Sequence, residues 1–228
     1  MKNAVVEIRD LAFAWPGGDA VLDLPALRIS VGERVFIKGP SGSGKSTLLG
    51  LLAGIQTANH GTLEVLGQPL ARLSGRARDH FRAANLGYIF QQFNLLPFLS
   101  VLDNVTAALT FSPEKRARLQ GSPEQEARRL LGELQLPDEA LHRPVHALSI
   151  GQQQRVAAAR ALIGSPPLVI ADEPTSALDT DNRAAFIKLL FEECDKQGST
   201  LVFVSHDPYL EPLFPRVENL QLLNRRAA

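Results

Sequence analysis

Short apolar stretches recur along the chain, and their periodicity predicts alternating strands and helices. Residues 4–13 alternate apolar and polar positions as a half-buried strand does, and residues 27–38 predict two short strands around a turn at Gly32. The helix that follows residue 44 is expected to end near Gly54, a typical C-terminal capping residue. The next part of the chain predicts a strand and turn over 61–70, then a helix leading into a strand over 76–90.

Residues 91–163 are predicted to be mostly helical, with one start signal that is specific. Ser122 is placed as N-cap, Pro123 at the first helical position and Gln125 as the partner in a capping box. The apolar stripe of this helix is formed by Ala127, Leu130, Leu131 and Leu134. A strand, a helix and a second strand follow, over 167–172, 182–196 and 199–206.

The order of these elements predicts a single α/β domain over residues 1–228. The expected architecture is a core of mainly parallel sheet, with an N-terminal antiparallel β subdomain and an inserted α-helical subdomain. The core lobe is expected over about residues 1–90 and 164–228, and the helical lobe over about residues 91–163.

Charge and cysteine content exclude some classes of function. Lys plus Arg equals Asp plus Glu at 24 each, so the net charge gives no reason to expect nucleic-acid binding. The arginines within 72–82, and those at 225 and 226, are interpreted as solvated faces. A single cysteine, Cys194, allows no disulfide within the chain, and its helical spacing from Ile187 and Leu190 places it in the core. The chain shows neither an export signal nor a run of about 20 apolar residues, which predicts a cytoplasmic protein.

A glycine-rich loop between a strand and a helix predicts phosphate binding. Gly39 is followed after four residues by Gly44, Lys45 and Ser46, which is the phosphate-loop spacing. Backbone N–H groups of such a loop, and the helix N-terminus behind it, attract an anion. Lys45 is expected to reach the β- and γ-phosphates, the Ser46 hydroxyl to bind Mg²⁺ and Thr47 to contact the α-phosphate. The predicted nucleotide contacts of the loop are Gly39, Pro40, Ser41, Gly42, Ser43, Gly44, Lys45, Ser46 and Thr47.

The phosphate loop alone fits kinases, GTPases, helicases and transport ATPases. The apolar strand over 168–172 ends in two acids, Asp172 and Glu173. Asp172 is placed to hold Mg²⁺ through water, and Glu173 to position or polarise an attacking water. An isolated acidic pair would more often simply close a strand into a turn.

The sequence LSIGQQQR, from Leu148 to Arg155, predicts a second phosphate-binding helix end. Ser149 and Gln152 form a plain capping box, which is a structural role. Gly151 also exposes a backbone N–H at that helix N-terminus, which is suited to an anion. Two subunits arranged head to tail would then hold two nucleotides between them.

At these residues the chain resembles the ATP-binding-cassette family, the nucleotide-binding subunits of ABC transporters. GPSGSGKST resembles the Walker A motif, LVIADE the Walker B motif with its catalytic glutamate, and LSIGQ the family signature. YIFQQFNLLP resembles the Q-loop, SALD the D-loop and VSHD the switch-histidine segment. The matching residues in these three segments are Gln91, Asp179 and His206.

The resemblance implies that the α/β core is a phosphate-loop NTPase core. It also implies an ATPase with ATP and Mg²⁺ as cofactors and a homodimer in the ATP state. Glu173, His206 and Gln91 would be catalytic, and Gln91 would join Ser46 and Asp172 at the metal. Ser149, Gly151 and Gln152 would contact ATP held by the opposite subunit. Asp179 would communicate between the two subunits of the dimer. Trp15 matches the aromatic residue that stacks on adenine, although a tryptophan there also suits a cap on the core.

The resemblance further implies integral-membrane permease subunits as partners, at the inner face of the cell membrane, and through them a periplasmic or adaptor protein. Residues 171–183 resemble the subgroup of macrolide efflux, lipoprotein release and cell-division remodelling, whereas residues 90–97 also resemble polar amino-acid importers. An ATP-gated scaffold in which hydrolysis is incidental stays open. Its support is Ile150, where the family usually has glycine. A small-molecule kinase is disfavoured by the signature and switch motifs.

Overall fold

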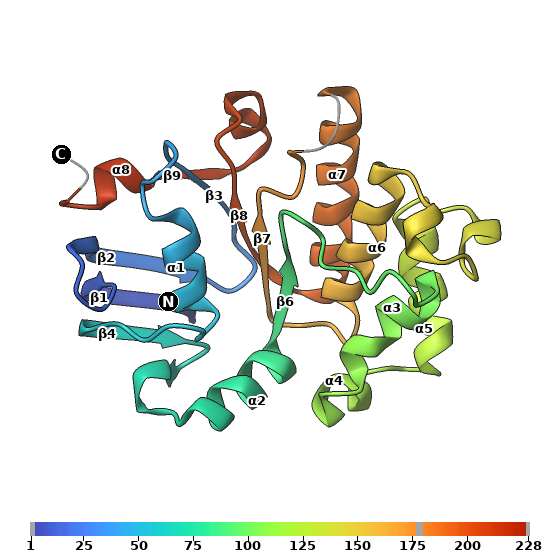
Figure 1. Cartoon of the computed structure of the whole chain (residues 1–228), viewed down its shortest axis with the longest axis horizontal. Helices are drawn as coiled ribbons and strands as arrows, with labels where there is room; N and C mark the ends of the chain where they lie inside the picture. Colours follow the sequence, from blue (N-terminus) through green and yellow to red (C-terminus); the bar gives the residue numbers. More distant parts are fainter. Residues whose placement is uncertain (1–2, 177–179, 227–228) are drawn as a thin grey trace. The chain divides into compact units, whose positions relative to one another are not determined.

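The N-terminal strands form an antiparallel sheet with the order β2-β1-β4-β5. The computed structural model describes residues 3–176 and 180–226 (Figure 1). The strands of this sheet are β1 (Ala4–Ala14), β2 (Ala20–Ser30), β4 (His60–Val65) and β5 (Gln68–Pro69). The predicted first strand is thus confirmed, and so is the turn at Gly32, whose φ is 76°.

Strand β2 is longer than the sequence indicates, because residues 20–26 extend it. Pro25 lies inside the strand, where a missing N–H normally argues against a strand. Since β2 is an edge of its sheet, one side of its backbone needs no partner strand, and proline is tolerated there.

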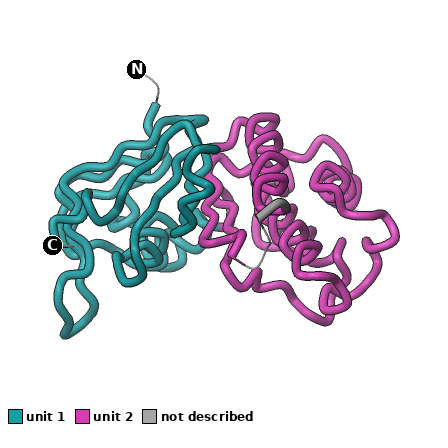
Figure 2. Tube along the Cα trace, turned by 90° about the horizontal axis from the view of Figure 1, so that it is seen from above, with its two compact units in different colours: residues 1–82, 200–228 teal, residues 83–199 magenta. Residues whose placement is uncertain are grey.

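Two compact units make up the chain, unit 1 with residues 1–82 and 200–228 and unit 2 with residues 83–199 (Figure 2). Unit 1 contains the antiparallel sheet and three parallel strands, in which β3 (Arg34–Lys38) pairs with β8 (Thr200–Val204) and with β9 (Arg216–Asn219). The helical elements of unit 1 are α1 (Lys45–Leu52), η1 (Leu70–Arg72), η5 (Pro208–Leu213) and α8 (Leu220–Leu223). Helix α2 (Gly75–Asn85) runs from unit 1 into unit 2.

Aromatic rings form part of the core of unit 1. Phe36 on β3 stacks on Phe203 of β8 with ring centroids 5.9 Å apart, and Phe214 lies 5.1 and 5.0 Å from these two rings. Because Phe36 and Phe203 are fully buried, β3 is anchored directly before the glycine-rich loop that follows it.

Unit 2 contains the parallel pair β6 (Leu86–Ile89) and β7 (Leu168–Asp172) and most of the helices. Helix α6 (Ile150–Leu162) packs against β6, α3, α5 and α7, so it is the central helix of this unit. The other helical elements are α3 (Val101–Thr106), η2 (Ala107–Leu109), α4 (Pro113–Ala117), α5 (Pro123–Glu133), η3 (Asp138–Ala140), η4 (Val145–Ala147) and α7 (Thr180–Gln197).

The predicted start of α5 and the predicted environment of the cysteine are confirmed. Ser122 is the N-cap of α5 with both hydrogen bonds of the capping box to Gln125, and Pro123 is the first helical residue. Cys194 is fully buried on α7. Among the described residues, none of the helices combines the length and the apolar character that spanning a bilayer requires.

Candidate functional site

At two positions of the glycine-rich loop of unit 1, a side chain would crowd a neighbouring residue. A Cβ on Gly39 would lie 2.5 Å from the Ser43 Oγ, and a Cβ on Gly44 would lie 2.7 Å from a methyl carbon of Leu22 on β2. Gly44 also has a φ of 93° and is the N-cap of α1, a conformation that other residues rarely adopt. A glycine-rich loop that leads into a helix N-terminus in this way suits a phosphate, because backbone N–H groups there can approach an anion closely.

Lys45 lies over this loop rather than extending into solvent. Its Nζ donates to the carbonyl oxygens of Gly39 at 2.7 Å and Pro40 at 3.0 Å. The hydroxyl of Ser43 is buried and has no hydrogen-bond partner among the described residues. A buried hydroxyl without a partner and a lysine on loop carbonyls both fit a loop shaped for an anion. Ser41 and Ser46 are exposed and Thr47 is half-buried.

Two arginines hold the other end of helix α1. The Nε of Arg78 donates to the carbonyl oxygen of Gly54 at 3.1 Å, and Arg82 donates to that of Ala53 at 3.2 Å. Cations at a helix C-terminus satisfy its last carbonyls and oppose its negative dipole end. The interpretation of the arginines within 72–82 as a solvated face is therefore wrong for these two residues. Sequence reasoning missed them because the contact depends on how α2 folds back onto α1.

Trp15 and His206 are the other two predicted site residues of unit 1. Trp15 is 46% exposed, and its ring stands edge-on to Phe13 at 5.1 Å and 86°. It therefore rests on the core without being covered by it. His206 is exposed and lies two residues after the last residue of β8, Val204. The next residue, Asp207, receives a hydrogen bond from the Tyr209 N–H and caps η5, which fixes the turn after the histidine.

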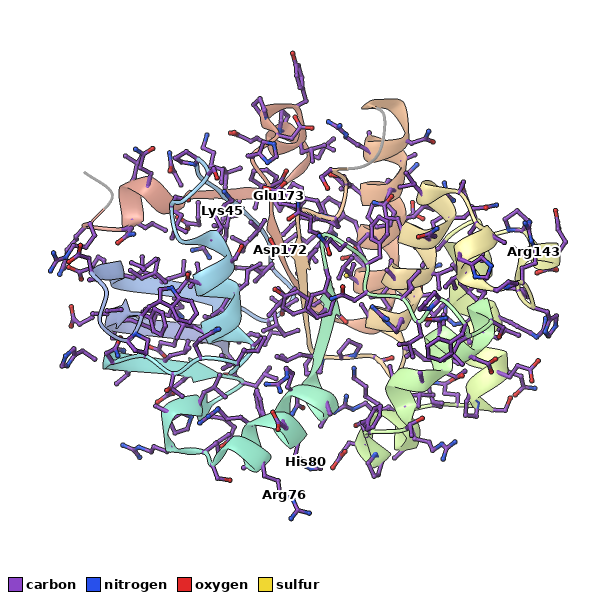
Figure 3. All side chains as sticks on the ribbon, in the orientation of Figure 1. Lys45, Arg76, His80, Arg143, Asp172 and Glu173 are labelled. Atoms are coloured by element: carbon purple, nitrogen blue, oxygen red, sulfur yellow. The ribbon has the colours of Figure 1, made fainter. Side chains whose placement is uncertain are left out.

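Asp172 and Glu173 lie in unit 2, at the end of strand β7 (Figure 3). Glu173 is only 8% exposed and has a φ of 46°, a left-handed conformation that is strained for a residue other than glycine. A backbone hydrogen bond from the Ser176 N–H to the Glu173 carbonyl, at 3.2 Å, closes the turn. Burial, and next the carboxylate of Asp172, raise the pKa of Tyr88 on the neighbouring strand. The strained, buried position of Glu173 is typical of a functional residue.

Gln91 is exposed in the loop after β6. The two residues that follow Gln92 in this loop have a left-handed backbone conformation. Phe93 and Asn94 have φ values of 57° and 49°. Their carbonyl oxygens accept hydrogen bonds from Arg160 of α6, at 2.5 Å and 2.6 Å. The loop that carries Gln91 is therefore tied to α6 by a guanidinium. The sequence gives no signal for this contact, since 66 residues separate Arg160 from Asn94.

The predicted capping box at the start of α6 is confirmed. The Ser149 Oγ accepts from the Gln152 N–H at 3.3 Å, and the Gln152 side chain accepts from the Ser149 N–H at 3.0 Å. Ile150, the first helical residue, is 53% exposed, so its bulk displaces no core side chain. A pocket of about 520 Å³ opens at this helix end, with lining residues that include Ser149, Gly151 and Gln152.

The described site residues fall into two groups. Unit 1 holds Trp15, the loop with Lys45, and His206, whereas unit 2 holds Gln91, the start of α6, Asp172 and Glu173. Asp179 lies outside the described residues.

The predicted metal ligands have the chemistry of a magnesium site. Ser46, Gln91 and Asp172 supply a hydroxyl, an amide carbonyl and a carboxylate, which are the oxygen donors that Mg²⁺ prefers. Within the described part of the chain, no three His, Cys, Asp or Glu side chains gather as a metal-binding cluster. Mg²⁺ in nucleotide sites commonly takes one or two protein ligands together with phosphate oxygens and waters, so this donor set fits it.

Comparison with known proteins decides the family. Residues 22–176 match the ABC transporter family. The chain belongs to this family. It is an ATPase cassette. Its resemblance to the macrolide-efflux and lipoprotein-release subgroup is confirmed by curated relatives from both systems.

Two curated relatives are the macrolide export ATP-binding/permease protein MacB of Shigella flexneri and the lipoprotein-releasing system ATP-binding protein LolD 2 of Rhodospirillum rubrum. The cassette is 39% identical to MacB over 93% of this chain and 32% of MacB. It is 40% identical to LolD 2 over 91% of this chain and 89% of that protein. The chain thus spans about a third of the length of the first curated relatives it matches. These relatives do not favour the alternative of a polar amino-acid importer.

A solved structure confirms the predicted fold class. The ATP-binding cassette MJ0796, described as a dimer in a post-hydrolysis state bound to ADP and Pi, superposes with a TM-score of 0.82. It is 32% identical to this chain, and the match covers 94% of this chain and 93% of that one.

Proposed function

We propose that the cassette hydrolyses ATP between two copies of the chain, each copy supplying one part of every site. The phosphate loop of one copy binds the triphosphate, and Ser149, Gly151 and Gln152 of the other contact its γ-phosphate. The observation that carries this proposal is the loop itself, in which a side chain at Gly39 or Gly44 would crowd a neighbour and Lys45 bonds to the carbonyls of Gly39 and Pro40. The MJ0796 cassette, which is dimeric and was bound to ADP and Pi, supports the dimeric arrangement.

Each remaining site residue takes a role that suits its surroundings. Lys45 neutralises phosphate charge, and Trp15 offers an exposed ring face on which the adenine base stacks. Ser46, Gln91 and Asp172 hold Mg²⁺, which supplies charge neutralisation between the phosphate oxygens when bound. Glu173 orients the attacking water, His206 holds the γ-phosphate, and Asp179 communicates between the two copies. The lobe over residues 91–163 moves with the nucleotide state.

The proposal is tested by Glu173→Gln, with Glu192→Gln on the exposed face of α7 as the matched control. Glu173→Gln is expected to lower the ATP hydrolysis rate at least 100-fold, an order of magnitude typical of removing a catalytic group, and to yield an ATP-stabilised dimer in gel filtration. Glu192→Gln is expected to behave like the wild type. Normal hydrolysis by Glu173→Gln would contradict the catalytic assignment, and undiminished ATP affinity of Lys45→Ala would contradict the role of the loop.

We further propose that the cassette drives a separate membrane permease, and that it lies at the cytoplasmic membrane face through this partner. Leu96 and Phe98, two positions apart in the loop after Gln91, are 41% and 76% exposed, and neighbouring exposed apolar side chains are typical of a contact with a partner. The names of MacB and LolD 2 support a system that exports or works across the cell envelope, in which a periplasmic or adaptor protein is reached through the permease.

Co-purification with candidate four-span permeases tests this second proposal. Phe98→Ser is expected to weaken complex formation while leaving ATP binding by the isolated chain unchanged. Tyr209→Ser, which removes a 79% exposed aromatic of unit 1, is the control. Measuring ATP hydrolysis with and without the permease separates a transport ATPase, which the partner stimulates, from a scaffold in which hydrolysis is incidental.

A further inference from the structure

A buried hydrogen bond joins helix α6 to the turn that carries Glu173. The Nε2 of Gln154 donates to the carbonyl oxygen of Pro174 at 2.8 Å. Gln154 has no exposed surface, and Pro174 is buried as well. Both groups are therefore removed from competing water, where a hydrogen bond is hardest to replace.

The turn that receives this bond needs support from its surroundings. Glu173 has a φ of 46°, and a residue with a side chain keeps such a conformation only when neighbouring groups hold it. Pro174 has no N–H and so contributes only its carbonyl oxygen to hydrogen bonding. The amide of Gln154 binds that oxygen, directly after the strained residue.

The same helix begins with the residues proposed to contact the nucleotide of the opposite copy. Gln154 is three residues beyond Gly151, which is about 4.5 Å along a helix that rises 1.5 Å per residue. Gly151 thus lies within one helical turn of Gln154, whose side chain bonds to the Glu173 turn, and Ser149 lies about 1.4 turns from it. A displacement at this helix end moves Gln154 with it, because a helix turn is stiff.

We propose that Gln154 is a positioning residue that fixes Glu173 relative to the signature end of α6. The inference rests on the proposed function, in which Glu173 orients water and Ser149 meets the partner's nucleotide. Through Gln154, occupancy of the opposite site sets the position of the carboxylate in a chain's own site.

The chemistry at position 154 favours this role over simple core filling. The Gln154 Oε1 is buried and has no hydrogen-bond partner among the described residues. An apolar side chain of similar volume would avoid burying that oxygen, so packing alone gives no reason for an amide here. The contribution specific to glutamine is the donor to Pro174.

The test compares Gln154→Met with Gln153→Met. Methionine matches glutamine in length and removes the amide. Gln153 is the control because it lies on the same helix, and its Nε2 bonds to the Leu148 carbonyl at 3.1 Å, away from the Glu173 turn. Gln154→Met is expected to lower kcat about tenfold or more, equivalent to about 1.4 kcal/mol of transition-state stabilisation. The KM for ATP should stay close to that of Gln153→Met, with both variants folded at the assay temperature. Values of kcat within about twofold of each other would overturn the role.

A second readout separates positioning of Glu173 from damage to the signature. In the Glu173→Gln background, adding Gln154→Met should leave the ATP-stabilised dimer intact, because dimerisation uses the signature and not the glutamate. Loss of this dimer would overturn the positioning role. If Glu173→Gln alone hydrolyses ATP normally, the proposed function fails and the role of Gln154 fails with it. A tenfold loss confined to Gln154→Met supports both.

Discussion

The guanidinium of Arg160 donates to the carbonyl oxygen of Phe93 at 2.5 Å. This hydrogen bond connects helix α6 to the loop that carries Gln91. Phe93 is left-handed at a φ of 57° and its side chain is 8% exposed. The charged donor stabilises a strained backbone conformation that the loop would not keep without it. Since Gln154 lies on the same helix, α6 contacts both the loop of Gln91 and the turn of Glu173.

Replacing Arg160 by methionine is expected to loosen the loop over residues 91–96. The carbonyls of Phe93 and Asn94 lose their donor, so amide hydrogen exchange in this segment should accelerate about tenfold or more. Arg155→Met is the matched control, because Arg155 donates to the carbonyls of Leu134 and Gln135 instead. Mass-spectrometric exchange would contradict the prediction if both variants left this segment equally protected.

Asn104 is expected to be essential for the loop that presents Phe98. Its fully buried amide accepts from the Leu96 N–H and donates to the carbonyls of Leu96, Leu99 and Ser100. Removing it takes away the bond to the Leu96 N–H and one bond from each of the three carbonyls, so Asn104→Ala should lower the free energy of unfolding by about 2–4 kcal/mol.

Urea denaturation of Asn104→Ala measures this loss, with Thr106→Ala as control. Thr106 bonds only within its own helix, to the Leu102 and Asp103 carbonyls, and its replacement should cost less than about 1 kcal/mol. Equal losses in the two variants would show that the amide does not organise the loop.

The two arginine–glutamate pairs on α5 should differ sharply in their contribution to stability. Arg129 bonds to Glu126 and to Glu193 of α7, whose side chain is 1% exposed, and Lys196 is the second cation near Glu193. Arg129→Leu leaves this buried carboxylate with one partner fewer, and should lower the free energy of unfolding by about 2–4 kcal/mol. Arg128 pairs with the exposed Glu124, so Arg128→Leu should cost under about 1 kcal/mol. Thermal and urea unfolding of the two variants measure these losses. A larger loss for Arg128→Leu than for Arg129→Leu would contradict the prediction.

Because of Lys115, the free energy of unfolding of unit 2 should change with pH in the alkaline range. Its Nζ is buried and donates to the Leu86 carbonyl at 2.8 Å. Burial, and next the charge of Arg118, lower the pKa of Lys115 to about 8 from the ordinary 10.5. Between these values the unfolded chain binds the proton more readily, so the free energy of unfolding should rise with pH, by about 3 kcal/mol at most. Below pH about 7 this group should contribute no slope.

Lys115→Met serves as the reference for this pH effect. Other titrating groups act on both proteins, so the difference between their unfolding free energies at pH about 7 and about 10 isolates Lys115. The wild type should gain relative to the variant over this range. Parallel pH profiles would mean that the lysine titrates normally in the folded chain.

Local sequence signals predicted the element types and the helix starts. Ser122 and Ser149 could be identified as N-caps because a hydroxyl followed three residues later by glutamine is a short-range pattern. The glycines of the phosphate loop were equally predictable, since their positions follow from the motif spacing.

Contacts between distant segments could not be predicted in this way. Gln154 and Arg160 bond to backbone carbonyls 20 and 67 residues away, and any residue supplies a carbonyl, so no spacing reveals the partner. Residues 20–26 of β2 were not predicted as strand. Pro25 is tolerated there because β2 is an edge strand, and edge position depends on the order of strands in the sheet. The left-handed turn at Glu173 was also hidden, since its sequence contains no glycine.

The placement of Lys45 on the carbonyls of Gly39 and Pro40 affects how fast and how selectively the loop captures its ligand. A flexible lysine normally gives up nearly 2 kcal/mol of rotational freedom when it is immobilised. Here folding has already restricted that motion. In the proposed function, a phosphoryl oxygen would therefore exchange with neutral acceptors at a smaller entropic penalty, and a weakly charged solute would compete poorly with the two carbonyls.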